Sequence, residues 1–149
     1  MKVLIIPIAL LMLAACGCAP DPKSGRGFSL PEGDPVRGQQ LFSELQCAAC
    51  HTVDGVEFDQ PQNPDQTIVA LGGKKFVVVT YGELVTSIIN PSHRFAVHYT
   101  DDEIKDGDKS KMRTYNDELT ITQLSDLVTF LESHYKVTPY EPTQYYPYY

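Results

Sequence analysis

The sequence predicts an all-α fold, a small domain of three to five helices. Three segments support this prediction: a capped amphipathic segment that begins at Asp34, a segment with helical spacing over residues 81–90, and a second amphipathic segment that begins at Thr120. The chain of 149 residues suits one such domain, with a modest hydrophobic core left after removal of any targeting segment.

The N-terminus is predicted to be a signal peptide over residues 1–15. Lys2 precedes an apolar run of about 11 residues that ends in small side chains. A run of this length is too short to span a bilayer, for which roughly 20 apolar residues are needed. The sequence therefore predicts an exported protein.

The end of this signal is more specific. Leu13-Ala14-Ala15-Cys16 resembles the lipobox of bacterial lipoproteins, in which the cysteine becomes the acylated first residue. Cys18 fits that pattern less well, and the alternative is an ordinary cleaved signal that happens to contain a cysteine. We expect lipidation at Cys16 and attachment to a bacterial membrane, with the protein facing the periplasm or the cell exterior.

Residues 16–33 form the predicted lipidated N-terminus and flexible tether, because they are rich in Gly, Pro and Ser and show no apolar period. Residues 34–135 form the predicted domain. Residues 136–149 are a Tyr- and Pro-rich tail, predicted to be disordered or, alternatively, a docking segment.

The charge is acidic. The full chain has a formal net charge of −7, and removal of residues 1–15 takes away one Lys and no acid, which leaves the mature chain one unit more negative. This charge argues against nucleic acid as a partner and favours a partner with a basic patch. The alternative is that the acidity serves solubility alone.

The first helix is predicted to start at the capping residue Asp34, with Pro35 in the first helical position. Its apolar residues are Val36, Leu41, Phe42 and Leu45. Gly38 costs about 1 kcal/mol relative to Ala inside a helix, so we expect it to allow the close approach of another backbone. The helix leads directly into the sequence CAACH.

The middle of the chain gives weaker signals. Residues 52–75 are predicted to be loop, residues 76–79 extended, residues 81–90 helical, and residues 92–117 polar loop. The last helix has the clearest pattern, since Thr120 and Gln123 form a capping box. Its apolar face comprises Leu124, Leu127, Val128 and Leu131, with Phe130 beside it.

The sequence CAACH, residues 47–51, predicts covalent attachment of one haem c. Residues three apart lie on the same face of a helical turn, so the sulfurs of Cys47 and Cys50 project together. Each can form a thioether with one haem vinyl group, while His51 binds the iron. The alternatives are a thioredoxin-like thiol pair, an accidental match, or a zinc site completed by His93 or His98.

The sixth ligand of the iron is predicted to be Met112, which is the single methionine outside the signal peptide and stands in a polar stretch. The alternatives are that Met112 packs in a satellite core, or that His93 or His98 binds the iron instead. A His/Met site has a higher potential than a His/His site.

Together these residues make residues 34–135 resemble a class I monohaem cytochrome c domain. The resemblance implies helices wrapped around one covalently bound haem c, with crossing N- and C-terminal helices. It also implies that Gly38 and Phe42 meet Phe130 where those helices cross. The stretch YGELVTSIINPS is similar to the helix that covers the haem before the methionine loop, and LTITQLSDLVTFLES to the terminal helix.

Two positions depart from the family pattern. Arg113 follows the predicted axial methionine where the family usually has Pro. The Gly-Pro dipeptide whose proline carbonyl accepts the haem histidine N–H in the family is missing after CAACH, so Pro64, or Pro61 as second choice, is predicted to supply that carbonyl.

The predicted function is transfer of single electrons between respiratory or photosynthetic redox partners, as a membrane-tethered carrier or a subunit of a complex. No catalytic constellation is present in the sequence, so neither an enzyme activity nor a small-molecule substrate is expected. The alternative is a haem-based sensor or binding lipoprotein with a labile sixth ligand.

Overall fold

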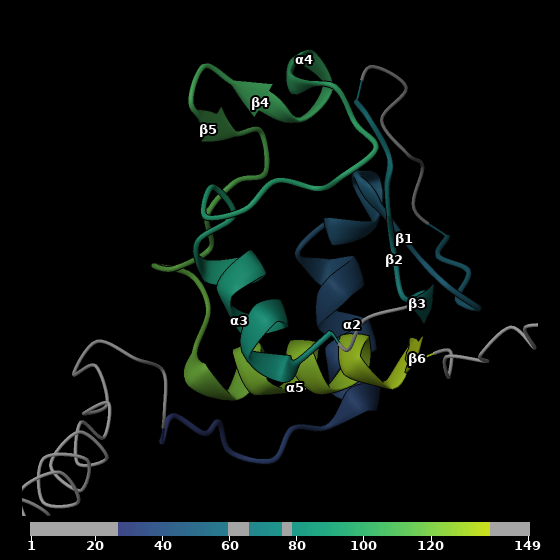
Figure 1. Ribbon diagram of the computed structural model, residues 1–149. Helices are drawn as coiled ribbons and strands as arrows, with labels where there is room; N and C mark the ends of the chain where they lie inside the picture. The colour runs from purple at the N-terminus through teal and green to yellow at the C-terminus, as the bar shows by residue number, and fades with distance from the viewer. Residues whose placement is uncertain (1–26, 60–65, 76–78, 138–149) are drawn as a thin grey trace, which may run out of the picture.

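The computed structural model describes residues 27–59, 66–75 and 79–137. The predicted signal peptide, Cys16, Cys18, Pro61, Pro64 and the tail beyond residue 137 lie outside these residues. Figure 1 shows α2 crossing α5, with α3 on one side of the crossing and the β4–β5 hairpin on the far side of the molecule from α5.

The prediction of an all-α fold is wrong. The described residues contain four α-helices, one 3-10 turn and six strands that pair into three two-stranded sheets. The helices are α2 (Pro35–Glu44), α3 (Tyr81–Ile89), α4 (Asp101–Ile104) and α5 (Ile121–Ser133), with η1 (Cys47–Ala49) as the 3-10 turn. The strands are β1 (His51–Val53), β2 (Val69–Leu71), β3 (Gly73–Lys75), β4 (Lys105–Asp106), β5 (Lys109–Ser110) and β6 (Tyr135–Val137).

The physical reason for this correction is that the strands are too short to carry an alternating pattern. None has more than three residues, whereas periodicity becomes readable over at least four. Two of the sheets are parallel and join distant segments, β1 with β2 and β3 with β6. Such pairings satisfy backbone groups of long connecting segments and leave no local mark in the sequence.

The predicted helix starts agree with the structure. Asp34 caps α2 by accepting the N–H of Val36 at 2.9 Å, and Pro35 occupies the first turn. The capping box of Thr120 and Gln123 is present at the start of α5. A further capping box, Thr80 with Glu83, starts α3. These local signals define where each helix begins.

The crossing of α2 and α5 depends on glycine. A Cβ atom placed on Gly38 would lie 2.1 Å from the backbone oxygen of Asp126 and 2.6 Å from Cβ of Phe130. A Cβ atom on Gly33, just before α2, would lie 2.3 Å from the backbone oxygen of Ser125. The two helices therefore touch backbone to backbone at two points along α5.

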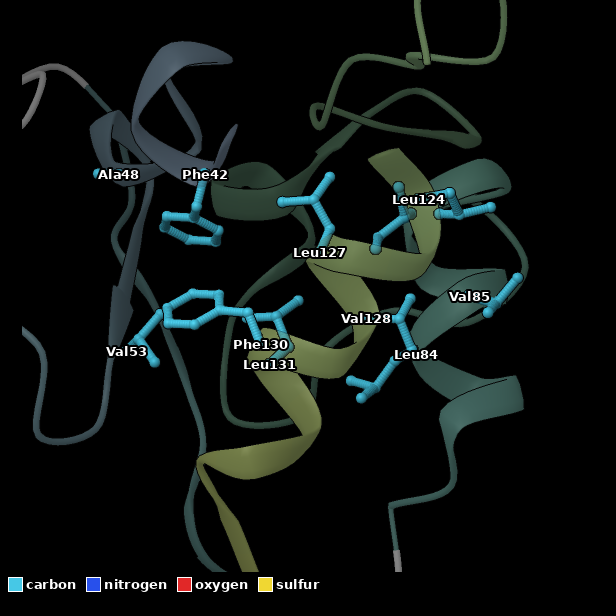
Figure 2. Close-up of a cluster of buried hydrophobic side chains, with 11 residues drawn as sticks. Phe42, Ala48, Val53, Leu84, Val85, Leu124, Leu127, Val128, Phe130 and Leu131 are labelled. Carbon is cyan, nitrogen blue, oxygen red and sulfur yellow. The ribbon is translucent and has the colours of Figure 1, made fainter. Parts of the chain in front are cut away.

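The core extends from this crossing, as Figure 2 shows. The ring of Phe42 meets that of Phe130 edge-on, with centroids 5.8 Å apart, and stacks on Phe58 at 5.1 Å. On the other side, α5 packs against Leu84 and Val85 of α3. One apolar cluster thus joins α2, α3 and α5.

A carboxylate lies buried in this interface. Asp126 on α5 is 2% exposed, and its Oδ1 accepts the N–H of Asp34 at 2.7 Å and an N–H of Arg37 at 3.3 Å. Both donors lie at the N-terminal end of α2, so the buried charge is paired and hydrogen-bonded, as buried charges must be. Asp126 thereby fastens the start of α2 to α5.

The end of the predicted tether lies against the domain. The hydroxyl of Tyr81 donates to the backbone carbonyl of Phe28, and Leu30 packs against the core. Among the described residues, no helix is long and apolar enough to cross a membrane.

Candidate haem site

The CAACH segment follows α2 through a sharp change of direction. Gln46 adopts a left-handed backbone conformation with φ of 60°, and η1 then carries Cys47. The N–H of Cys50 donates to the carbonyl of Cys47 at 3.2 Å, which closes the turn. Both cysteines are partly exposed free thiols, and the S–H of Cys50 donates to the side-chain oxygen of Gln66 at 2.7 Å.

Burial raises the pKa of the Cys47 thiol to about 11, although a hydrogen bond with Tyr115 acts in the opposite direction. Burial also raises the pKa of Cys50. Both sulfurs are therefore protonated near neutral pH.

His51 is held in one tautomer. Its Nδ1–H donates to the backbone carbonyl of Val69 at 3.1 Å, so Nε2 keeps its lone pair for a metal. Burial lowers the pKa of the imidazole, with the Val69 contact as a smaller opposing effect, so the ring is neutral near neutral pH. A neutral imidazole with a fixed second nitrogen is the form that binds iron.

The partner of His51 is one that the sequence did not indicate. The acceptor is the carbonyl of Val69, whereas the predicted acceptor Pro64 lies outside the described residues. The parallel pairing of β1 with β2 places His51 opposite Val69 and supplies this carbonyl. Sequence reasoning looked for a proline because the family uses one, and the pairing of two distant three-residue strands gave no local signal.

Tyr99 is a second residue that sequence reasoning missed, and it holds the backbone next to Val69. The hydroxyl of Tyr99 donates to the carbonyl of Ile68 at 3.3 Å and accepts the N–H of Ala70 at 3.4 Å. Tyr99 therefore binds the backbone on both sides of Val69. This contact joins the loop after α3 to the strand that orients His51.

A hollow of about 350 Å³ lies beside His51. Its lining combines apolar surface with two exposed acids, and consists of Ala48, His51, Thr52, Val56, Glu57, Phe58 and Asp59. Of the predicted haem-binding residues, only His51 lines this hollow.

Met112 lies in the loop between β5 and α5, partly exposed, and its N–H donates to Oγ of Ser110 at 3.1 Å. The same loop lies near the CAACH turn, because the hydroxyl of Tyr115 donates to the backbone carbonyl of Leu45 at 3.1 Å and the tyrosine is close enough to Cys47 to affect the pKa of its thiol. The structure thus brings the loop that carries Met112 to the first cysteine of the motif.

The rival histidines lie on the surface. His93 is exposed and its Nδ1–H donates to the carbonyl of Asn90 at 2.9 Å, while His98 is exposed in a left-handed backbone conformation. In the part of the chain that the structure describes, no three His, Cys, Asp or Glu side chains form a group that could hold a bare metal ion.

These features define a small protein with a CxxCH turn for covalent haem, supported by two crossing helices. The family model for cytochrome c matches residues 35–134. The chain therefore belongs to the cytochrome c family. No curated protein sequence and no solved structure matches the chain.

Membership of the cytochrome c family implies which cofactor the protein binds and its general activity. Members bind covalent haem c and transfer electrons, and they are not themselves catalytic enzymes. The residues present fit that group, because two reduced thiols three residues apart precede a neutral histidine whose free nitrogen is Nε2.

Proposed function

We propose that this protein is a monohaem c-type cytochrome, tethered to a bacterial membrane, that passes single electrons between respiratory or photosynthetic partners as a carrier or a subunit of a complex. The observation that carries the proposal is the CAACH turn itself, with His51 oriented by Val69. Haem supplies the one-electron couple, and the protein supplies attachment, ligands and surroundings.

Each residue of the proposed site has one task. Cys47 and Cys50 hold the cofactor covalently, which allows a small domain to retain a large group. His51 is the first axial ligand and Met112 the second. A six-coordinate iron has no position for a substrate, so such a site transfers electrons and does little else.

The proposed partners are redox proteins that present a basic patch. The chain has a formal net charge of −7, and Glu57 and Asp59 lie exposed at the hollow beside His51. Opposite charges at the two docking surfaces would speed association.

Replacement of Met112 by alanine is expected to remove the weak far-red sulfur–iron absorption band and to lower the reduction potential. The thioether is a soft ligand that favours ferrous iron, so its loss stabilises the oxidised state. Spectra of the oxidised and reduced protein, with a potentiometric titration, measure both effects. An unchanged spectrum would show that another residue binds the iron, and ready carbon monoxide binding by the wild type would favour a sensor.

Replacement of Cys16 by serine is expected to release the protein from membranes into the soluble exported fraction. The thiol of Cys16 is the proposed point of acylation, and serine removes it with little change in size. Fractionation and mass measurement of the mature N-terminus test this. Cys18→Ser is the matched control and should remain membrane-bound; if the Cys16 variant stays bound and acylated, the proposed anchor is wrong.

A further inference from the structure

The side chain of Tyr115 links the loop that carries Met112 to the end of α2, next to the CAACH turn. This tyrosine is only 7% exposed, although it stands in a polar stretch of the sequence. Its hydroxyl donates to the backbone carbonyl of Leu45 at 3.1 Å, which joins two segments 70 residues apart. Leu45 is the C-terminal cap of α2 and lies two residues before Cys47.

This contact satisfies a carbonyl that the helix leaves without a partner. The last carbonyls of an α-helix have no N–H within the helix, and they need a side chain, water or another backbone group. The Tyr115 hydroxyl takes that position at the end of α2 and also interacts with the sulfur of Cys47. It therefore binds where the helix ends and the haem attachment turn begins.

Tyr115 is itself held from several sides. The guanidinium of Arg113 lies 4.5 Å from the centre of its ring and pairs with Glu118. The backbone carbonyl of Tyr115 accepts the N–H groups of Glu118 and Leu119, each at 2.9 Å. These contacts hold both the ring and the backbone of Tyr115 in place. Met112 is three residues before it in the chain.

On the N-terminal side of Met112, the chain is held to the loop after α3, because the N–H of Ser110 donates to Oγ of Ser92 at 3.0 Å. On the C-terminal side, Tyr115 is bonded to Leu45, two residues before Cys47. The Tyr115 side therefore ties the methionine loop to the segment that carries the cysteines.

We propose that Tyr115 is a positioning residue for the sixth ligand, and that its bond to the Leu45 carbonyl keeps the Met112 loop closed against the haem attachment turn. This inference rests on the proposed function, because it takes Met112 as the axial ligand. When the bond is broken, the loop opens more often and the methionine leaves the iron more often.

The test compares two tyrosine-to-phenylalanine variants of the haem-loaded protein. Tyr115→Phe keeps the ring and its stacking with Arg113 but removes the hydroxyl. Tyr81→Phe is the matched control, since its hydroxyl also donates to a distant backbone carbonyl, that of Phe28, away from the CAACH turn. The measurements are the rate of carbon monoxide binding by the ferrous protein, the sulfur–iron band and the midpoint of thermal unfolding.

Carbon monoxide can bind only after Met112 has left the iron, so the binding rate reports how often the loop is open. Loss of one hydrogen bond of ordinary strength is expected to raise that rate by about 2- to 12-fold in Tyr115→Phe. Tyr81→Phe is expected to lose stability and to keep the wild-type rate. If both variants change the rate in proportion to their loss of stability, or neither changes it, Tyr115 has only a structural role.

A second variant separates the ring contact from the hydroxyl. Arg113→Gln leaves the hydroxyl and its bond to Leu45 in place but removes the cation from the ring, and is expected to raise the rate by a smaller factor than Tyr115→Phe; a rate as high as that of Tyr115→Phe would overturn the proposal. If the wild-type protein itself lacks the sulfur–iron band, Met112 is not the ligand. That result overturns the positioning role and the sixth-ligand assignment together, while haem attachment at Cys47 and Cys50 stands.

Discussion

The double replacement of Cys47 and Cys50 by alanine is expected to yield a chain with no covalently attached haem. Each sulfur forms one thioether in the proposed site, so the removal of both leaves only coordination through His51. Coordination does not survive denaturation, whereas a thioether does. Haem staining after denaturing electrophoresis and the mass of the intact chain measure the result. Each single variant should keep one bond.

The control for this experiment is Cys18→Ala, which makes the same change at a cysteine outside the motif and should retain the full haem content. All proteins must be exported in a host competent in cytochrome maturation. Covalent haem on the denatured double variant would show that other residues carry the attachment. A colourless wild-type chain of unmodified mass would contradict the haem assignment altogether.

The replacement of Gly38 by alanine is expected to destabilise the fold by about 3 kcal/mol or more, at the upper end of the usual range for overpacking. The added methyl group would lie 2.1 Å from the backbone oxygen of Asp126, and neither backbone can move without separating α2 from α5. Denaturant unfolding, followed by circular dichroism, gives the free energy of unfolding.

The matched control is Gly82→Ala, at a helical glycine where the nearest heavy atom to an added Cβ is Oγ1 of Thr80 at 3.9 Å. With that space available, alanine is expected to stabilise α3 by about 0.5–1 kcal/mol through its better helix propensity. The two substitutions should therefore have opposite signs. Equal stabilisation by both would mean that α2 and α5 do not approach as closely as described.

The parts of the fold that the sequence predicted correctly are those with local causes. Asp34 and Thr120 begin their helices because a side-chain oxygen accepts nearby backbone N–H groups, and this needs only a few adjacent residues. The CAACH motif is also a local feature, since it is recognised from the spacing of residues within five positions. The helix starts could therefore be predicted directly, and the same local pattern names Cys47, Cys50 and His51 as the proposed attachment residues.

The parts that were missed have non-local causes. The strands β1 and β2 exist because residues 51–53 and 69–71 meet in space, and the same pairing gives His51 its carbonyl at Val69. The role of Tyr115 depends on a carbonyl 70 residues away. A large aromatic residue in a charged stretch was the one signal for Tyr115 in the sequence.

The two backbone contacts at Gly33 and Gly38 have a consequence for how the protein matures. They make the position of the CAACH segment depend on α5, which is synthesised well after that segment. Contacts between segments so distant in the sequence form slowly, because a long loop must close first. In the exported protein proposed above, the thiols would therefore emerge into an oxidising compartment before the helix that supports them.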